Sequence, residues 1–315
     1  MDQLRLKSLD KFIDPQLTAD GKERASVALQ SLQTLWFNTG SMCNLSCDNC
    51  YIESNPHNDR LTYLTVQDVA SYLEEIETLR LPTALIGFTG GEPFLNPDFL
   101  NILQLTLEKG FATLVLTNGF RRIERYKAEL LALNKRYGDK LQLRISLDHH
   151  SSSIHEKERG ARTFDPALKT AKWLFDQRFR LSIAGRAIES ESQRDAMQGY
   201  QDLFKEYGIG LNANSSEHLV VFPEMDLEKD VPEITVDCWD ILNKKPEQQM
   251  CASERMIVKH KGNDKPAVMP CTLLAYDPQF ILGTNLNSAE KKVQLNHKFC
   301  AQFCVLGGAS CSSTA

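Results

Sequence analysis

Long apolar runs are missing from this chain of 315 residues. No stretch approaches the roughly 18 consecutive apolar residues of a membrane-spanning helix, and residues 1–14 mix charges with single leucines where a signal peptide would be apolar. Glycine (17) and proline (12) are too few for a low-complexity chain. Lys and Arg (36) are outnumbered by Asp and Glu (41), which leaves no broad positive surface for a phosphate backbone. We expect a globular, cytoplasmic protein without a membrane or nucleic-acid partner.

Short apolar segments alternate with helical patterns along the first two thirds of the chain. Thr65 followed by Asp68, for example, has the spacing of a capping box at a helix start. Helices between successive strands predict parallel pairing, hence an open doubly wound sheet or a full or partial barrel, with functional groups at the carboxyl ends of the strands. The predicted strands cover residues 35–39, 84–88, 112–116, 141–147, 181–188 and 209–213.

The nine cysteines fall into two groups. An odd number cannot form a complete set of internal disulfides, and a reducing cytosol keeps thiols free. Three cysteines follow the first predicted strand, and the other six all come after residue 237. This distribution favours two thiolate-rich sites over random filling of the core.

Cys43, Cys47 and Cys50 form a C-x-x-x-C-x-x-C motif followed by Tyr51. Three thiolates are one fewer than the usual four of a 4Fe-4S cluster, which leaves one iron open to another ligand. The motif resembles that of the radical S-adenosylmethionine (radical SAM) superfamily, in which the amino and carboxylate groups of S-adenosylmethionine bind the open iron. Zinc or reactive thiols are the alternative, although zinc normally takes four ligands.

A second motif, Gly90-Gly91-Glu92-Pro93, follows the second predicted strand and is similar to the GGEP of the same superfamily. The resemblance implies that it holds the amino group of the cofactor. The residue types agree, because glycines let a ligand approach the backbone and a carboxylate suits an ammonium group. By itself, this sequence would be an ordinary turn.

Further residues at strand ends are similar to cofactor-binding positions of the superfamily. Tyr51 resembles the aromatic residue that packs beside the adenine, with a simple core aromatic as the alternative. Arg186 is placed to meet the cofactor carboxylate or to form a salt bridge. The similarity also assigns positions near the ribose and carboxylate, and in the Arg-Gly pair of the family, to Thr117, Asn118, Ser146, Asp148 and Arg159.

Two stretches lack such a match. His149 and His150 stand where many relatives have glycine, and two imidazoles at a barrel mouth would act as proton donors or substrate ligands, with solvated loop histidines as the alternative. The last predicted strand brings polar residues to a place where they would touch a substrate, without a motif to support them: Asn212, Asn214, Ser215, Glu217 and His218.

The C-terminal cysteines are similar to the SPASM and twitch extensions of radical SAM enzymes, which carry auxiliary 4Fe-4S clusters. Six cysteines are too few for two fully ligated clusters, so the resemblance implies one, with structural zinc as the alternative. Cys238 has no assigned role, and residues 310–315 look like a frayed tail. The implied ligands are Cys251, Cys271 and Cys300, with Cys304 or Cys311 as the fourth.

The resemblance spans roughly residues 33–311 and implies an α/β fold, a partial (β/α)6 TIM-like barrel with a small cysteine-rich auxiliary-cluster domain. The expected organisation is a polar N-terminal extension over 1–32, the barrel over 33–225 and the auxiliary domain over 226–315. The implied activity is reductive cleavage of S-adenosylmethionine to a 5'-deoxyadenosyl radical, which takes hydrogen from a substrate. An auxiliary cluster would support oxidation or bond formation.

The substrate class is open between a small molecule and a peptide. Only about 35 residues precede the first predicted strand, fewer than the winged-helix leader-binding domain of many peptide-modifying relatives needs. We therefore expect a small molecule, or a peptide that a separate protein recognises, together with a low-potential electron donor such as flavodoxin or ferredoxin. The alternative from another class is a non-catalytic iron-sulfur or zinc protein that serves electron transfer or an accessory role.

Overall fold

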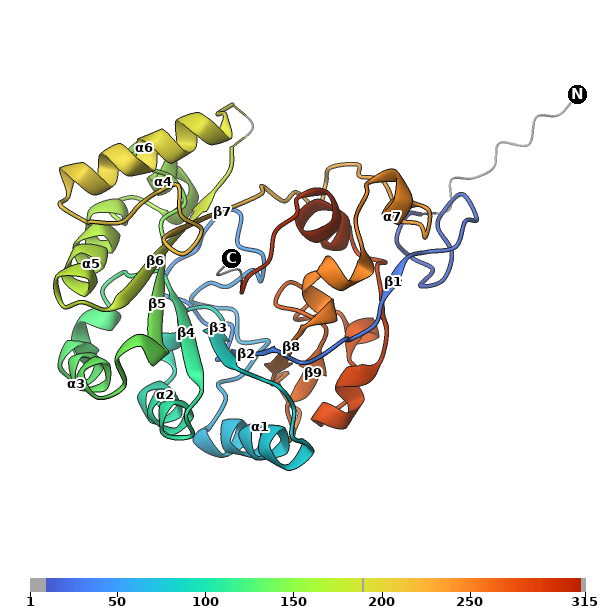
Figure 1. Cartoon of the computed structure of the whole chain (residues 1–315), viewed down its shortest axis with the longest axis horizontal. Coiled ribbons are helices and arrows are strands. Elements are labelled where there is room, and N and C mark those ends of the chain that lie inside the picture. Colours follow the sequence, from blue (N-terminus) through green and yellow to red (C-terminus); the bar gives the residue numbers. More distant parts are fainter. Residues whose placement is uncertain (1–9, 189, 313–315) are drawn as a thin grey trace, which may run out of the picture.

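One curved sheet organises the described part of this computed structural model, residues 10–188 and 190–312 (Figure 1). Its strands lie in the order β7-β6-β5-β4-β3-β2-β8-β9; neighbours are parallel from β7 to β8, and β9 runs antiparallel to β8. This is the predicted partial barrel. The strands are β2 (Thr34–Asn38), β3 (Leu85–Thr89), β4 (Ala112–Thr117), β5 (Leu141–Ser146), β6 (Arg180–Arg186), β7 (Leu219–Phe222), β8 (Glu254–Val258) and β9 (Ala267–Met269).

Helices cover the outer face of the sheet (Figure 1). The capping box predicted at Thr65 is present, because its hydroxyl accepts from the Asp68 N–H while the Asp68 carboxylate accepts from the Thr65 N–H. Within the described residues, no helix combines the length and the apolar character needed to cross a bilayer. The helices are α1 (Val66–Leu79), α2 (Phe99–Glu108), α3 (Lys127–Tyr137), α4 (Ser152–Arg159), α5 (Phe164–Asp176), α6 (Gln193–Glu206) and α7 (Cys238–Ile241).

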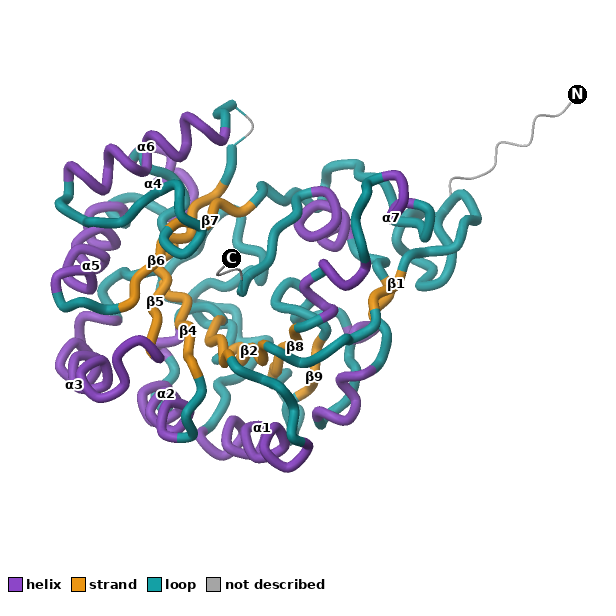
Figure 2. The backbone as a smooth tube through the Cα atoms, viewed as in Figure 1, coloured by secondary structure: helices purple, strands orange, loops and turns teal. Residues whose placement is uncertain are grey.

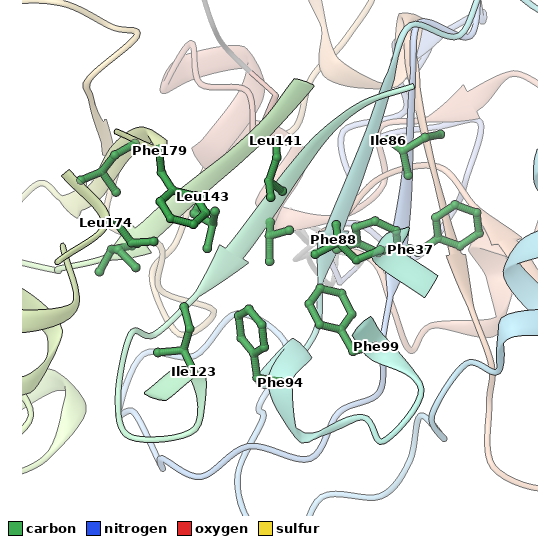
Figure 3. Packing of buried hydrophobic residues seen from close by; sticks show 14 of the residues in the cluster. Phe37, Ile86, Phe88, Phe94, Phe99, Ile123, Leu141, Leu143, Leu174 and Phe179 are labelled. Atoms are coloured by element: carbon green, nitrogen blue, oxygen red, sulfur yellow. The ribbon is translucent and has the colours of Figure 1, made fainter. Parts of the chain in front are cut away.

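The core between the sheet and its outer helices is built around aromatic rings (Figure 3). Phe88 stacks on Phe37 at 5.8 Å between ring centroids and meets the edge of Phe99 at 5.5 Å. Phe94, which follows the Gly-Gly-Glu-Pro segment, packs edge-on against Phe99 at 5.1 Å. These contacts fix the carboxyl end of β3 against α2, so the loop that follows β3 starts from a rigid base.

The last strand of the barrel differs from the prediction. Residues 209–213 are not a strand; β7 comes later, at Leu219–Phe222. The alternation of buried and exposed side chains on which the prediction was based is present, since Ile209, Leu211 and Ala213 are buried. Side chains satisfy the backbone there, however, with the Ala213 N–H donating to Gln201 Oε1. The polar residues over 212–218 therefore precede β7 instead of following a strand.

The C-terminal region joins the barrel sheet. Strand β8 pairs with β2 over Thr34–Phe37, and β9 extends the sheet by one more strand. After a π-helical segment over Cys300–Leu306, the chain turns at Gly308 (φ 63°) and enters the space inside the curve of the sheet (Figures 1 and 2). Residues 310–312 are thus held inside the molecule, contrary to the expected frayed tail, of which 313–315 lie outside the described residues.

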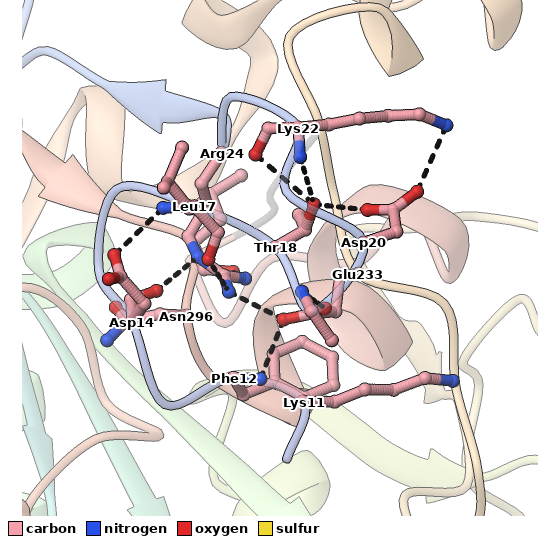
Figure 4. Close-up of polar contacts among 12 residues, drawn as sticks. Lys11, Phe12, Asp14, Leu17, Thr18, Asp20, Lys22, Arg24, Glu233 and Asn296 are labelled. Atoms are coloured by element: carbon pink, nitrogen blue, oxygen red, sulfur yellow. Dashed lines mark hydrogen bonds and ion pairs between the residues drawn. The ribbon is translucent and has the colours of Figure 1, made fainter. Parts of the chain in front are cut away.

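The N-terminal segment packs on the C-terminal region. Residues 1–9 of the expected polar extension lie outside the described residues, and the description of the segment begins at residue 10. The guanidinium of Arg24 pairs with Glu233 at 2.5 Å, and Glu233 also accepts from the Phe12 N–H (Figure 4). Strand β1 (Ser26–Val27) then pairs with β10 (Val293–Gln294). These contacts hold the described part of the N-terminal segment on the C-terminal region.

Candidate functional site

A cavity of about 180 Å³, partly open to solvent, lies at the carboxyl ends of strands β3 to β7. That is where a parallel α/β barrel gathers residues from many loops. It collects the three cysteines of the first motif and nine of the eleven residues expected to bind cofactor. These twelve are Cys43, Cys47, Cys50, Tyr51, Gly90, Gly91, Thr117, Asn118, Ser146, Asp148, Arg159 and Arg186.

The loop that carries the first cysteines is held by hydrogen bonds to their sulfurs. Cys43 Sγ accepts from the Leu45 N–H at 3.4 Å and from Asn118 Nδ2 at 3.7 Å, and Cys50 Sγ accepts from the Ser54 N–H at 3.3 Å. Burial raises the pKa of Cys43 to about 12, with the nearby carboxylate of Glu92 adding to the shift. Thiolates therefore form here only with a cation to compensate them, as in a metal cluster.

The paired glycines let the end of β3 touch the start of this loop. The Gly91 N–H donates to Gly40 O at 2.8 Å, and a Cβ on Gly91 would lie 2.1 Å from Met42 O. Gly90 has a φ of 135°, which side chains rarely adopt. The glycines were expected to let a ligand approach the backbone. In the structure they let the backbone of the cysteine loop approach the end of β3.

Glu92 and Pro93 do not line the cavity. The Glu92 carboxylate accepts from the Thr117 hydroxyl at 2.8 Å and from the Asn118 N–H at 2.9 Å. Pro93 is buried as the first residue of a short 3-10 turn. Burial raises the pKa of Glu92 to about 7 against these hydrogen bonds. Glu92 consequently acts indirectly, by positioning Thr117, the last residue of β4, and Asn118, which follows it; both line the cavity.

Three charged residues form the polar wall of the cavity. Asp148 accepts from Arg159 Nη2 at 2.8 Å, and its other oxygen lies 3.8 Å from Arg186 Nη2. Burial acts to raise the pKa of Asp148, but Arg159 and Arg186 outweigh it and the pKa is lowered. Asp148 Oδ2, Arg159 Nε, and Arg186 Nε and Nη1 are buried with no hydrogen-bond partner among the described residues. This wall is charged and incompletely satisfied, as expected of a site that binds a polar ligand.

Several residues of the cavity were not predicted. The ring of Tyr51 meets Phe303 edge-on at 6.4 Å, and Arg186 lies over it at 5.1 Å. Of the missed residues, only Arg144 carried a signal, as a charged residue in an otherwise apolar strand. The lining residues that were not predicted include Arg144, Phe222, Thr272 and Phe303. Cys311, which was predicted as an auxiliary ligand, also lines this cavity.

A second, small cavity of about 20 Å³ is lined by four of the C-terminal cysteines among apolar side chains. Cys300 and Cys304 come from the π-helical segment, where a spacing of four residues leaves both on one face. Burial raises the pKa of Cys251 to about 11 and that of Cys300 to about 12. The cysteines that line this cavity are Cys251, Cys271, Cys300 and Cys304.

Cys311 is separated from these four. It was expected as one of two candidates for the last auxiliary ligand, but it lines the first cavity, because the chain turns into the barrel after Gly308. Cys238 lines neither cavity; its sulfur accepts from the Thr235 N–H at 3.4 Å. Leu273 lines both cavities, so the two lie back to back.

His149 and His150 also lie outside the cavity lining, facing Glu191 at 3.1 and 2.8 Å. The three ligand atoms lie within 4.8 Å of one another. However, His149 Nδ1 accepts from the Ser151 N–H at 2.9 Å, so the neutral ring carries its proton on Nε2. A metal at Nε2 requires the other tautomer, and the group is better described as hydrogen-bonded histidines on a shared carboxylate.

Comparison with known proteins agrees with this geometry. The family model of the radical SAM superfamily matches residues 37–197, just over half of the chain. The antilisterial bacteriocin subtilosin biosynthesis protein AlbA of Bacillus subtilis is 32% identical over 51% of this chain and 35% of its own length. The mycofactocin maturase MftC of Mycolicibacterium smegmatis is 26% identical over 54% of this chain and 41% of its own length. The chain thus corresponds to less than half of either relative.

A solved structure shares the fold over a longer range. Streptococcus suis SuiB, in a crystal structure bound to the precursor peptide SuiA, superposes with a TM-score of 0.59. The match covers 89% of this chain and 67% of that one at 16% identity. At this identity the likeness shows the fold alone.

Proposed function

The chain belongs to the radical SAM superfamily, and from this premise we propose that it is a peptide-modifying radical SAM enzyme with one auxiliary 4Fe-4S cluster. Cys43, Cys47 and Cys50 would hold the first 4Fe-4S cluster, and the first cavity would bind the S-adenosylmethionine that this cluster cleaves. The auxiliary ligands are Cys251, Cys271, Cys300 and Cys304.

The observation that carries this proposal is the composition of the first cavity. Three thiols from one loop face a wall where buried Asp148 and Arg186 keep polar atoms without partners. A cofactor with amino, carboxylate and ribose groups supplies the missing partners, and the apolar side formed by Tyr51 and Leu116 suits its adenine.

When bound, the cluster and S-adenosylmethionine supply a carbon radical able to take hydrogen from an unactivated C–H bond. The residues of this chain would supply the remaining functions: Asp148 and Arg186 orient the cofactor, and the half-buried ring of Tyr51 with the buried ring of Phe303 keeps water from the reacting atoms. Glu92 contributes indirectly by holding Thr117 and Asn118 at the cavity wall.

The spacing of the cysteines supports iron-sulfur clusters over zinc. In a tetrahedral zinc site, with Zn–S near 2.3 Å, neighbouring sulfurs are about 3.8 Å apart. Among residues 10–188 and 190–312, the one group of three or more ligating side chains that could hold a single ion is His149, His150 and Glu191, and no three cysteines form such a group. Neither cysteine set is therefore arranged around a single ion, which favours a multi-iron cluster over zinc.

A peptide is the substrate class that we favour over the small molecule. AlbA takes part in bacteriocin biosynthesis, MftC is a maturase and SuiB binds a precursor peptide. The first cavity is partly open to solvent, which lets one residue of a longer chain reach the thiol loop. An auxiliary cluster in the second cavity would lie behind Leu273, which lines both cavities, and would exchange electrons with the groups in the first cavity. A low-potential donor such as flavodoxin or ferredoxin would reduce the first cluster.

The test is anaerobic reconstitution followed by iron and sulfide analysis and an assay for 5'-deoxyadenosine with dithionite. We expect about eight irons per chain in the wild type and about four in the variant with Cys43, Cys47 and Cys50 all changed to Ala, which also loses cofactor cleavage. Cys238→Ala is the matched control, because it removes a thiol from outside both cavities. Iron without any 5'-deoxyadenosine would favour the electron-transfer alternative, and zinc in place of iron would refute the proposal.

A further inference from the structure

One cysteine lies in the first cavity without belonging to either cysteine set. Cys311 comes from the C-terminal segment, yet it lines the same cavity as the thiol loop. Its sulfur is buried and lies 3.1 Å from the Thr272 hydroxyl. The thiol is therefore close to the reacting groups but is not needed as a ligand, since the auxiliary cavity already has four cysteines.

The segment that carries Cys311 is firmly held. Arg144 Nη1 donates to the carbonyl of Cys311 at 2.8 Å. The hydroxyls of Ser310 and Ser312, on either side, both donate to Glu254, whose other oxygen accepts from Trp36 Nε1 at 2.6 Å. Three barrel strands thus anchor one turn of chain and keep its thiol at the cavity wall.

Independent features show that this cavity is built for a ligand. Asp148 and Arg186 are only 5% and 6% exposed, and both have polar atoms without hydrogen-bond partners among the described residues. Both line the cavity together with Cys311. A ligand that forms hydrogen bonds with these polar atoms would occupy the cavity that the Cys311 thiol also lines.

We propose that Cys311 is a catalytic hydrogen-atom donor, which returns hydrogen to a carbon radical formed in the first cavity. This inference rests on the proposed function. An S–H bond is weaker than most C–H bonds, so the transfer is downhill. Burial keeps the donor in its protonated form, because it raises the pKa of Cys311 to about 12.

The step balances with groups already named. The S–H bond of Cys311 breaks and a C–H bond forms, which leaves one unpaired electron on sulfur. One electron from the low-potential donor and one proton from solvent then restore the thiol. Thr272, the hydrogen-bond partner of Cys311, directly follows Cys271, which lines the second cavity, so an auxiliary cluster there would adjoin the thiol.

The first arm of the test measures placement without using activity. In the reconstituted protein, Cys238 and Cys311 are the cysteines that neither cluster uses, and alkylation by iodoacetamide at each is followed by mass spectrometry. We expect S-adenosylmethionine to slow alkylation of Cys311 and leave that of Cys238 unchanged. Equal alkylation of Cys311 with and without the cofactor would overturn its placement at the reaction site.

The second arm follows the hydrogen atom, with S-adenosylmethionine itself as the probe. The cofactor is cleaved with dithionite in D₂O, where the thiol carries deuterium, and the 5'-deoxyadenosine is analysed by mass spectrometry. We expect carbon-bound deuterium with the wild type and with Cys238→Ala, and its loss with Cys311→Ala and Cys311→Ser, all with the iron content of the wild type.

The outcomes separate the two proposals. If the wild type forms no 5'-deoxyadenosine, the proposed function fails and this inference falls with it. If 5'-deoxyadenosine forms but carries the same deuterium in wild type and Cys311→Ala, the inference alone is wrong. Loss of the auxiliary irons in Cys311→Ala would likewise overturn it, because Cys311 would then be a cluster ligand.

Discussion

The sulfur of Cys311 and the hydroxyl of Thr272 lie 3.1 Å apart, although 39 positions separate them in the chain. Thr272 follows Cys271, which lines the second cavity, whereas Cys311 and Thr272 line the first. The contact therefore marks the wall between the two cavities. Of the six C-terminal cysteines, four line the second cavity, Cys311 lines the first and Cys238 lines neither.

This division predicts different results for Cys304 and Cys311. Cys304→Ala removes one of four clustered thiols, so we expect the reconstituted protein to fall from about eight irons to about four, whereas Cys311→Ala keeps about eight. Iron and sulfide analysis with electron paramagnetic resonance of the reduced protein measures this. The reverse pattern would exchange the roles of the two cysteines, and Cys238→Ala should match the wild type.

Removing the charge of Asp148 is predicted to weaken binding of S-adenosylmethionine. Asp148→Asn loses a charge-assisted hydrogen bond to the cofactor and leaves Arg159 and Arg186 less well compensated. Such bonds contribute about 1.5–3 kcal/mol, so the dissociation constant should rise roughly 10- to 100-fold. Equilibrium binding to the anaerobic protein measures it, with the exposed Asp139→Asn as the matched control. An unchanged affinity at full iron content would remove Asp148 from the cofactor site.

Gly91 is predicted to tolerate no side chain. In Gly91→Ala the new Cβ would meet Met42 O at 2.1 Å, and relief requires the cysteine loop to move. We expect a loss of about 1–3 kcal/mol in the free energy of unfolding and poor retention of the first cluster. Gly262→Ala is the comparison, since it has a φ of 86° but open space around it, and its cost should be about 1 kcal/mol with iron retained. Equal behaviour of the two variants would contradict the steric argument.

The buried His155 is predicted to make the stability of the fold sensitive to acid. Burial, and then the charge of Arg159, lower the pKa of His155 to about 4, and its Nδ1 accepts from the Asp148 N–H at 3.2 Å. In the unfolded chain His155 is protonated below about pH 6.5, whereas in the folded chain it stays neutral down to about pH 4. The free energy of unfolding therefore falls as the pH drops from above 6.5 towards 4, by at most about 1.4 kcal/mol per pH unit.

Replacing His155 should flatten that dependence. The measurement is the thermal midpoint of the reconstituted protein between pH 7 and pH 5, where the wild type should lose stability faster than His155→Gln. The exposed His57→Asn controls for removal of a histidine that the fold does not bury. Parallel curves for wild type and His155→Gln would show that His155 is not the group responsible.

Local spacing was enough to predict much of this protein. The cysteine loop, the Gly-Gly-Glu-Pro segment and the capping box at Thr65 each depend on residues a few positions apart, whose geometry the backbone sets directly. The alternation of strands and helices predicted the barrel for the same reason, because period and parallel connection follow from the chain alone. Nine of eleven predicted cofactor residues line one cavity because strand ends meet at one edge.

Only the tertiary structure decided the rest, since those features depend on contacts between distant segments. Residues 209–213 have the alternation of a strand, but side chains of other residues bind their backbone and leave Leu219–Phe222 to complete the barrel. Spacing also could not choose between Cys304 and Cys311. A π-helical turn keeps Cys304 with Cys300, and hydrogen bonds to Arg144 and Glu254, both far away in the sequence, draw Cys311 into the barrel.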